Sequence, residues 1–327
     1  MTNLTAPVQV DVRDLEAEFE RQRVALTGYC YRMLGSAFDA DDAVQETMVR
    51  AWRGVSRFEG RAALRSWIYR IATNVCFDML RGRGRRAMPM DLGPASSGAT
   101  PADAPSGEVS WLQPVPDGRV IATDDPAEVS STRESVRLAF VAALQHLPPR
   151  QRAVLVLRDV LAWQATEVAE LLATTPTSVH SALQRARRSL AARDLGTPSA
   201  PMDAEHRALL DRYVDAFERY DVEALVALLH DDATMSMPPF ALWLRGPDAI
   251  GRWWRGHGGA CRGGRLIPSP VQANGSPAFG LYRRASGEAG IGFGLQVVEV
   301  DGGRIRGLHT FLDADLAGLF GLPAVID

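Results

Sequence analysis

The chain has 327 residues, an apolar content of 46% and a formal net charge of −3, which indicate a globular protein with room for two or three domains. No apolar run reaches the ~20 residues of a membrane-spanning helix, and the N-terminus has no signal-peptide pattern, so we expect a cytoplasmic protein. Cys30, Cys76 and Cys261 are widely separated and form no CxxC pair. They exclude a disulfide framework and a zinc ribbon, and they fit core packing in a reducing compartment.

All 36 basic residues are arginine, because the sequence contains no lysine. This excludes Schiff-base chemistry and the lysine of a phosphate-binding loop. Residues 61–86 hold seven arginines and one acid, Asp78, while residues 177–193 hold four arginines and no acid. Two basic segments in an acidic chain predict two separate contacts with a polyanion.

Residues 14–86 predict a compact helical unit. After a helix over 14–33, the segment DADDAVQETMVRAWR begins with Asp39, a suitable N-cap. Its apolar positions, ending at Trp52, recur at helical spacing and predict one buried face. The positions left on the outer face are Asp42, Gln45, Glu46, Val49, Arg50 and Arg53. Taken alone, such a face is more often an ordinary solvated surface than a binding site.

A third helix is predicted for the segment ALRSWIYRIATNVCFDMLRGRGRR. One side is apolar and includes Trp67, whereas Tyr69 and Arg70 lie off that side. The remaining polar positions are Arg65, Asn74 and the closing Arg81, Arg83, Arg85 and Arg86. An arginine-rich helix end of this kind can hold phosphates.

Residues 87–131 differ in composition from the segments on either side. They contain seven prolines, four glycines and seven acids with a single arginine, so we expect an acidic, flexible linker without a fold of its own. Trp111 and Leu112, in the motif WLQPVPDG, are unusual there because large apolar groups favour docking on a surface. A chance tryptophan in a disordered segment explains the motif about as well.

Residues 132–195 are again predicted to be helical. A helix over 133–147 ends at two prolines, a second follows, and the next segment divides into two short helices joined by a tight turn, as in a helix-turn-helix. The last helix begins with Thr175 as N-cap and Pro176 at the first helical position. Its predicted buried face consists of Val179, Leu183, Ala186 and Leu190. The positions free for solvent or a DNA groove are Thr177, Ser178, His180, Ser181, Gln184, Arg185 and Arg188.

A short linker, residues 196–202, precedes a different pattern in residues 203–327. Two predicted helices lead to several strand-like runs with turn signals between them. Helices followed by a strand meander favour an α+β, cone-shaped barrel around a pocket. The pocket candidates are Tyr213, Trp243, Trp254 and His309.

The first two units resemble a bacterial RNA polymerase sigma factor of the extracytoplasmic-function (ECF) group. DADDAVQETMVRAW resembles the region 2 helix that grips the clamp of RNA polymerase, and RSWIYRIATNVCFDMLR the segment that opens and reads the −10 promoter element. LPPRQRAVLVLRDVLAWQATEVAELLATTPTSVHSALQRARR resembles the region 4 helix-turn-helix that reads the −35 element. The resemblance covers about half of the chain. It implies two all-α domains, 1–86 and 132–195, that bind the clamp and flap of core RNA polymerase and promoter DNA.

This resemblance implies roles for the outward residues. Core polymerase is expected to contact Asp42, Gln45, Glu46 and Arg50. The −10 element is expected to contact Arg61, Arg65, Trp67, Tyr69, Arg70, Asn74 and Arg81. The −35 element is expected to contact the seven outward positions of the last helix in 132–195. Many members carry basic residues where His180 and Ala182 stand, which shifts the expected contacts toward Arg185 and Arg188.

Residues 203–327 are similar to the SnoaL-like branch of the NTF2-like superfamily, through RYVDAFERYDVEALVALLHDDATMSMPP and VDGGRIRGLHTFLDADLAGLFGLP. Some ECF sigma factors carry such a domain together with a Trp-Leu-Pro-rich linker motif, which WLQPVPDG resembles. The combination implies a sigma factor whose activity is modulated in cis by its C-terminal domain, with Trp111 and Leu112 as docking residues.

Catalysis, ligand sensing and an inhibitory contact surface all remain open as roles of the C-terminal domain. Relatives include isomerases and cyclases, but Met237 stands where an enolising isomerase keeps its base carboxylate, and methionine cannot take a proton. We therefore expect no enzyme, cofactor or metal, and leave a small-molecule ligand open. The alternative from another class is a DNA-binding regulator fused to a ligand-binding or isomerase-like domain. It gives no purpose to the helix that begins near Asp39.

Two promoter contacts imply a distance. Elements about 17 base pairs apart, at 3.4 Å per base pair, are separated by ~60 Å. A flexible linker of 45 residues has a root-mean-square span of roughly 35–40 Å and an extended reach near ~150 Å, so it spans the promoter easily. It is also loose enough for the two helical units to fold back on each other in the free protein.

Overall fold

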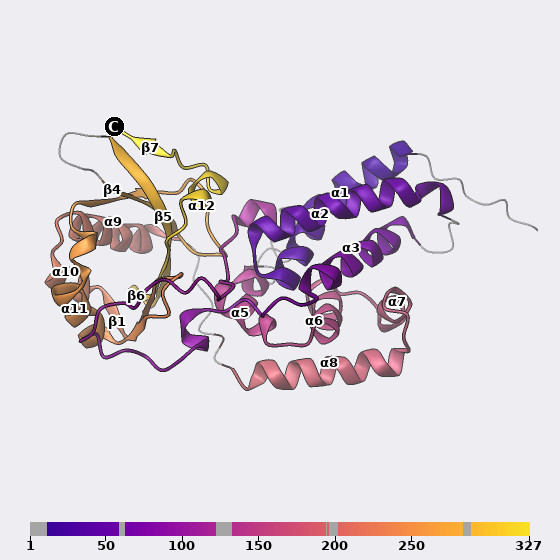
Figure 1. Cartoon of the computed structure of the whole chain (residues 1–327), viewed down its shortest axis with the longest axis horizontal. Helices are drawn as coiled ribbons and strands as arrows, with labels where there is room; N and C mark the ends of the chain where they lie inside the picture. The colour runs from indigo at the N-terminus through magenta and orange to yellow at the C-terminus, as the bar shows by residue number, and fades with distance from the viewer. Residues whose placement is uncertain (1–11, 59–62, 122–132, 194, 196–201, 284–288) are drawn as a thin grey trace, which may run out of the picture. The chain divides into compact units, whose positions relative to one another are not determined.

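The computed structural model describes residues 12–58, 63–121, 133–193, 195, 202–283 and 289–327. These residues form two compact units (Figure 1). The first unit contains the chain up to Arg85 together with Gly118–Leu195, and the second contains Arg86–Asp117 together with Gly196–Asp327. The chain therefore passes from the first unit to the second and back before it enters the C-terminal part.

The N-terminal part of the first unit consists of α1 (Val12–Leu34), α2 (Ala37–Gly54) and α3 (Leu64–Leu80). The three helices pack on one another and bury side chains such as Tyr29 and Ile68 completely. The N-cap of α2 is Ser36 and not Asp39, because the Ser36 hydroxyl accepts a hydrogen bond from the Asp39 amide at 3.1 Å. The Asp39 carboxylate instead lies in the first helical turn, where the helix dipole favours it.

The apolar stripe of α2 turns away from the core along the helix. Val44 is buried, Met48 is intermediate, and Trp52 is 47% exposed. Each step of four residues rotates the side chain by about 40° about the helix axis, so that Trp52 is rotated by about 80° relative to Val44. The prediction that Trp52 belongs to the core is therefore wrong.

The rest of the first unit contains α5 (Leu138–Gln145), α6 (Pro149–Leu155), a π-helical turn (Val156–Val160), α7 (Ala165–Leu171) and α8 (Pro176–Ala191). The helix expected over 133–147 is interrupted at Arg137, whose backbone is extended (φ −51°, ψ 142°). The N-cap prediction for α8 is confirmed, because the Thr175 side chain accepts from the Ser178 amide. No helix among the described residues is long and apolar enough to cross a bilayer.

The second unit is built on a mixed seven-stranded sheet. Its strands are β1 (Leu229–Ser236), β2 (Trp243–Arg245), β3 (Gly264–Pro268), β4 (Ala278–Arg283), β5 (Gly290–Asp301), β6 (Arg304–Phe311) and β7 (Val325–Ile326). The order is β2-β1-β6-β5-β4-β3, with β7 paired to β5 and with β1 parallel to β6. β2 and β3 stand at opposite ends of this order, so the sheet is open and the predicted barrel is not closed.

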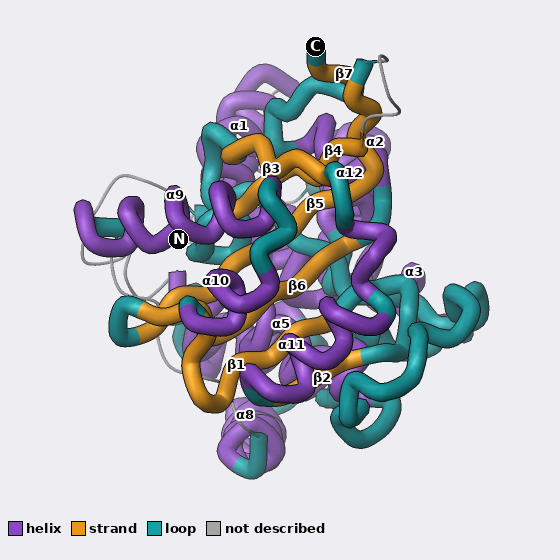
Figure 2. The backbone as a smooth tube through the Cα atoms, turned by 90° about the vertical axis from the view of Figure 1, so that its left-hand side faces the viewer, coloured by secondary structure: helices purple, strands orange, loops and turns teal. Residues whose placement is uncertain are grey.

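Helices cover one face of this sheet. They are α9 (Ala204–Glu218), α10 (Val222–Ala227) and α11 (Pro247–Gly256), while the short α12 (Ala314–Leu319) packs on β5. Figure 2 shows α9, α10 and α11 in front of the strands. Their apolar sides and the facing strand residues form one core, which includes Tyr213, Ile250 and Val298. The predicted order of helices followed by strands thus gives the α+β layer arrangement.

Of the flexible linker predicted for residues 87–131, residues 122–131 lie outside the described residues, and residues 87–117 are not the featureless segment that their composition predicts. They pack along the second unit, where Ser96 pairs with Leu244 of β2 and Pro116 pairs with Ala273. Between Arg86 and Val115, the one helical element is the short 3-10 turn Pro89–Asp91. Composition misleads here because a few apolar side chains bury completely, while the prolines between them keep the backbone extended without a partner strand.

Candidate polymerase and nucleic-acid interfaces

The outward face of α2 presents the polar side chains that the sequence predicts. Asp42, Gln45 and Glu46 are exposed and Arg50 is partly exposed. Trp52 follows Gln45 by seven residues, which places both on the same side of the helix. This face therefore combines polar groups with one large exposed aromatic side chain, a composition typical of protein interfaces.

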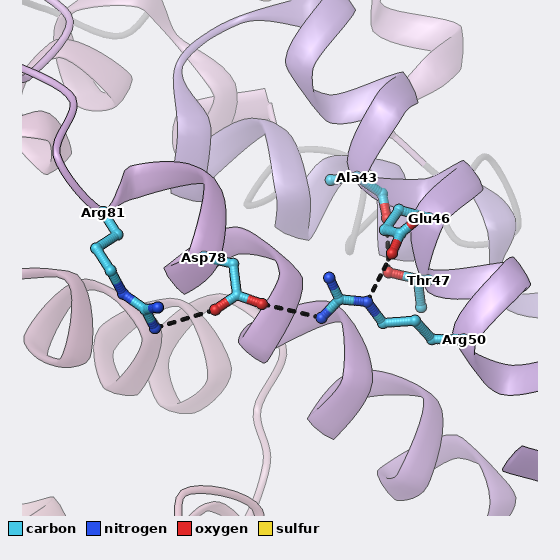
Figure 3. A network of polar contacts seen from close by, with 6 residues as sticks. All are labelled: Ala43, Glu46, Thr47, Arg50, Asp78 and Arg81. Carbon is cyan, nitrogen blue, oxygen red and sulfur yellow. Dashed lines mark hydrogen bonds and ion pairs between the residues drawn. The ribbon is translucent and has the colours of Figure 1, made fainter.

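Arg50 joins this face to the end of α3 through a chain of ion pairs (Figure 3). Its Nε donates to Glu46 Oε1 at 2.7 Å, and its Nη1 donates to Asp78 Oδ2 at 3.0 Å. The other Asp78 oxygen accepts from Arg81 Nη2 at 3.1 Å. Hydrogen bonds from Arg50 to Glu46 and then to Asp78 raise the pKa of the Arg50 guanidinium. The Arg50 guanidinium is thus fixed by two carboxylates, one bonded to Nε and the other to Nη1.

The residues predicted to read the −10 element have different environments. Arg61 lies outside the described residues. Exposed side chains of or next to α3 are Arg65, Arg70, Asn74 and Arg81. Trp67 is half-buried, with its ring centroid 5.2 Å from that of Phe58. The described part of this set therefore presents three arginines and one amide to solvent.

Tyr69 is fully buried, contrary to the prediction that it lies off the apolar side of its helix. Its ring contacts Tyr29 of α1 and Trp163, with centroid distances of 5.5 and 5.0 Å. Burial raises the pKa of the Tyr69 phenol well above its usual range. The periodicity of a single helix could not show this, because the second partner, Trp163, comes from a different part of the first unit.

The recognition helix of the predicted helix-turn-helix, α8, shows the expected division into two faces. Its buried residues are Val179, Leu183, Ala186 and Leu190. Ser181 is half-buried, and the exposed candidates are Thr177, Ser178, His180, Gln184, Arg185 and Arg188. Arg187, which the sequence analysis leaves out, donates two hydrogen bonds to Asp159, at 2.7 and 2.8 Å. Arg187 is thus paired within the unit, whereas all the predicted candidates except Ser181 are exposed to solvent.

Two buried arginines link α1 to the second half of the first unit. Arg32 donates from Nε to the Ser135 carbonyl at 3.1 Å and from Nη2 to the Ser135 hydroxyl at 2.7 Å. Arg152 of α6 donates to the carbonyls of Met33 and Leu147 and to both oxygens of Gln145. Within the described part of the chain, neither has a carboxylate partner. Burial lowers the pKa of each guanidinium to about 10.

Arg65, Tyr69 and Trp163 form a stacked cluster next to the contact made by Arg32 and Arg152. The Arg65 guanidinium lies 4.9 Å from the Trp163 ring centroid and 5.8 Å from that of Tyr69. Trp163 lies two residues before α7, the first helix of the helix-turn-helix. In this structure the −10 candidates Arg65 and Tyr69 therefore contact the segment that carries the −35 candidates.

The four pocket candidates of the second unit do not converge. Tyr213 and Trp254 belong to the core beneath the helices. Successive strand residues point to opposite faces, so Ser236 and Trp243, which neighbour the core residues Met235 and Leu244, point to the other face. The candidate His309 lies on that other face with Ser236, since its Nδ1 is 2.9 Å from the Ser236 hydroxyl oxygen. The set is thus divided between the two faces of the sheet.

A short polar chain crosses the core of the second unit. The Tyr213 hydroxyl donates to Gln296 Oε1 at 2.6 Å, and Gln296 Nε2 donates to the Thr310 hydroxyl at 2.9 Å. Burial raises the pKa of Tyr213 well above its usual range. Met237 is partly buried and packs against the same core. Tyr213, Gln296 and Thr310 are all buried, and each already has a hydrogen-bond partner among the three.

The segment with WLQPVPDG makes polar contacts with two other parts of the second unit. Leu112 is fully buried and Trp111 is half-buried, and Gln113 donates to Asp313 at 3.3 Å. Asn274 Oδ1 accepts from the Val115 amide at 2.9 Å. The sequence predicts the docking of Trp111 and Leu112, while the polar contacts of Gln113 and Val115 could not be predicted from it.

Comparisons with known proteins agree with this architecture. Family models match Sigma-70 region 2 over residues 19–86, Sigma-70 region 4 over residues 137–190 and a SnoaL-like domain over residues 210–308. The ECF RNA polymerase sigma factor SigG of Mycobacterium tuberculosis (strain ATCC 25618 / H37Rv) is 45% identical over 319 residues, which are 95% of this chain and 84% of SigG. The chain belongs to the ECF RNA polymerase sigma factors.

Two further similarities extend this comparison. The ECF sigma factor SigJ of the same strain is 29% identical over 244 residues, 72% of this chain and 71% of SigJ. A crystal structure of M. tuberculosis SigJ has a TM-score of 0.59 and 23% sequence identity, and the match covers 94% of this chain and 99% of that chain. The fold of this sigma factor is therefore that of an ECF protein with an additional C-terminal domain. As a sigma factor, the protein works with core RNA polymerase and promoter DNA in transcription initiation.

Region 2 and region 4 of this sigma factor pack directly against each other. Tyr69 of region 2 and Trp163 of region 4 have ring centroids only 5.0 Å apart. If the two regions bind promoter elements about 17 base pairs, or ~60 Å, apart, as the resemblance implies, they must be well separated along the duplex. The structure is thus a compact form in which α3 and the helix-turn-helix contact each other directly.

Proposed function

We propose that three exposed faces of the sigma unit divide the work of promoter recognition. α2 binds the polymerase clamp through Asp42, Gln45, Glu46 and Arg50, α3 and its arginine-rich end contact the −10 element, and α8 contacts the −35 element. The supporting observation is that α2 and α8 each expose these polar side chains while the opposite side of the helix is buried. Arginines beside exposed small polar groups suit phosphate and groove contacts.

Glu46 offers a direct test of the α2 assignment. Glu46→Lys reverses an exposed charge and removes one partner of Arg50 without disturbing a buried group, so the fold should persist. We expect a loss of affinity for core polymerase of about tenfold in a pull-down or titration. Glu16→Lys, at an exposed position of α1, is the matched control and should bind normally. Equal affinity of both variants and the wild type would refute the assignment.

The closed sigma unit is, on this proposal, the polymerase-free form. Arg32 and Arg152 hold region 2 against region 4 with neutral acceptors, and a guanidinium buried without a carboxylate is less stable than one in water. Core polymerase gains contacts to both regions only when they separate. Separation of the two regions therefore replaces a weakly stabilising contact between them with contacts from each region to core polymerase.

The C-terminal domain is proposed to control this step in cis through the linker. Residues 86–117 pack on it, so the linker residues that remain to span the promoter are fewer than the 45 that the sequence provides. Leu112→Ala should release the docked segment because Leu112 is fully buried, whereas Leu92→Ala, at a 44% exposed position of the same segment, should not. We expect Leu112→Ala, Trp111→Ala and truncation after Leu195 all to change promoter-directed transcription. Unchanged transcription in all three would contradict the proposal.

A regulatory role of the C-terminal domain is better supported than a catalytic one. Met237 packs against the core where an isomerase would need a base, and the pocket candidates lie on two faces of the sheet. For a small-molecule ligand, the supporting feature is the Tyr213–Gln296–Thr310 chain. A ligand there must replace hydrogen bonds that the chain already makes, which requires a polar group of its own.

Run-off transcription with purified core RNA polymerase tests the function as a whole. We expect initiation from a promoter with −10 and −35 elements only when the chain is added. A DNA-binding regulator without a polymerase role would bind DNA but leave the core enzyme without specific initiation. That result would refute the assigned function of the α2 face and of the arginine-rich end of α3 together.

A further inference from the structure

Asp78 is the only acid between residues 61 and 86, a segment with seven arginines. It lies near the C-terminal end of α3, with its side chain 44% exposed. One carboxylate oxygen accepts from Arg50 of α2 and the other from Arg81, at 3.0 and 3.1 Å (Figure 3). A single carboxylate thus bridges the helix assigned to polymerase binding and the first arginine after α3.

We propose that Asp78 is a positioning residue that holds the Arg81 guanidinium ready for a phosphate of the promoter near the −10 element. The inference rests on the proposed DNA contact of Arg81. Asp78 itself makes no contact with DNA on this proposal, because its two oxygens are engaged by the two arginines.

The geometry leaves Arg81 able to bind a phosphate while it is held. Asp78 binds only Nη2 of the guanidinium, so that Nε and Nη1 remain as donors. α3 ends at Leu80, and Arg81 and Gly82 leave the helix with φ of −68° and +76°. Without Asp78, a long side chain at this helix end would have many rotamers, and DNA binding would have to restrict them.

The charge of Asp78 is compensated before any DNA arrives. Arg50 binds Asp78 and is in turn bound by Glu46, so the four side chains alternate in sign as acid, base, acid and base. A compensated carboxylate repels a nearby phosphate less than a free one does. A second acid–arginine pair follows two residues later, where Arg83 Nη1 lies 3.2 Å from Asp39 Oδ2 of α2. Acids of α2 and α3 thus hold two successive exposed arginines of this segment.

The positioning role and general electrostatics predict opposite changes in DNA affinity for Asp78→Asn. Removing a negative charge beside a polyanion should by itself strengthen binding. If Asp78 positions Arg81, the same substitution should weaken binding by about two- to fivefold, the scale of one exposed, ordered ion pair. Loss of one ordered phosphate contact should also lower the slope of log affinity against log salt by up to about one.

The test uses holoenzyme assembled from core polymerase and the full chain, with a fluorescent fork-junction DNA that carries a −10 element. We expect Arg81→Gln and Asp78→Asn each to weaken DNA binding and reduce the salt slope, and the double variant to be no weaker than Arg81→Gln. Asp78→Glu should restore much of the affinity. Asp159→Asn, which removes an acid bonded to Arg187 of region 4, is the matched control and should leave binding to this DNA unchanged.

The outcomes separate this inference from the function on which it rests. Normal binding by Arg81→Gln would refute the DNA contact of Arg81 and the inference with it. Weakened binding by Arg81→Gln but unchanged or tighter binding by Asp78→Asn would refute the inference alone. Additive losses in the double variant would also refute the inference, because they would show that Asp78 does not act through Arg81. The same holds if Asp78→Asn loses as much affinity for core polymerase as for DNA, because Asp78 would then act on polymerase binding.

Discussion

Two groups of arginines in this sigma factor differ in their environment. Arg185 and Arg188 of α8 and Arg81 after α3 are exposed, while Arg32 and Arg152 are buried between region 2 and region 4. The exposed group presents its guanidinium groups to solvent, although Arg81 also donates to Asp78, and the buried group donates to main-chain, hydroxyl and amide oxygens of the protein itself. Because the chain contains arginine and no lysine, burial rather than residue identity separates the proposed DNA contacts from these two internal structural contacts.

The largest expected effect comes from removing a buried arginine. Arg152→Ala leaves the carbonyls of Met33 and Leu147 and the side chain of Gln145 without a donor, and should lower the free energy of unfolding by roughly 3 kcal/mol. Urea denaturation of the full chain, followed by circular dichroism, measures this. Arg188→Ala, at an exposed position, should change stability by less than ~0.5 kcal/mol. Similar losses of unfolding free energy in both variants would contradict the claim that only the buried arginines stabilise the fold.

The exposed group should show the opposite response. Arg188→Gln should weaken binding of the holoenzyme to a −35 duplex by about fivefold and lower the salt slope by about one, with no change in unfolding. Arg13→Gln, at an exposed position of α1, provides the control for a general loss of positive charge. Fluorescence anisotropy at several salt concentrations gives both quantities. An equal loss in the two variants would mean that the effect of Arg188 is not local.

The smallest effect is a pH dependence of the buried group. Burial lowers the pKa of Arg32 to about 10, so the unfolded chain binds this proton more tightly than the folded chain does. The destabilising contribution of Arg32 is complete below pH ~10 and is relieved as the pH rises above that value. The stability of the wild type relative to Arg32→Met should therefore increase between about pH 9 and pH 11. Buried tyrosines are common to both proteins and cancel in the difference. A flat difference would contradict the shifted pKa.

Local periodicity predicts well those features that depend on one helix and its cap. The buried and exposed faces of α8 follow from Val179, Leu183 and the Thr175–Pro176 start, because a recognition helix packs on one side only. The outward position of Asp42, Gln45 and Glu46 on α2 follows from the same argument. The order of helices and strands in the C-terminal domain also indicates its layers, although not whether its sheet closes.

The features that the sequence does not predict depend on contacts between distant segments. Tyr69 is buried because Trp163 covers it, and these residues are 94 positions apart. Arg32 and Arg152 resemble any other arginine until their partners Ser135 and Met33 are known. For residues 86–117, average composition indicates disorder, while the docking depends on a few buried side chains such as Leu112. Asp78 was visible as the lone acid of a basic segment, but its two partners were not.

The distance between region 2 and region 4 tests the central claim most directly. Donor and acceptor dyes at the exposed positions Glu20 of α1 and Ser189 of α8 would report it by energy transfer in the full chain. We expect efficient transfer in the free protein and a marked fall when core polymerase and promoter DNA are added, as the regions move toward the ~60 Å that the two promoter elements require. Transfer that stays high in a transcriptionally active holoenzyme would contradict the opening of the sigma unit.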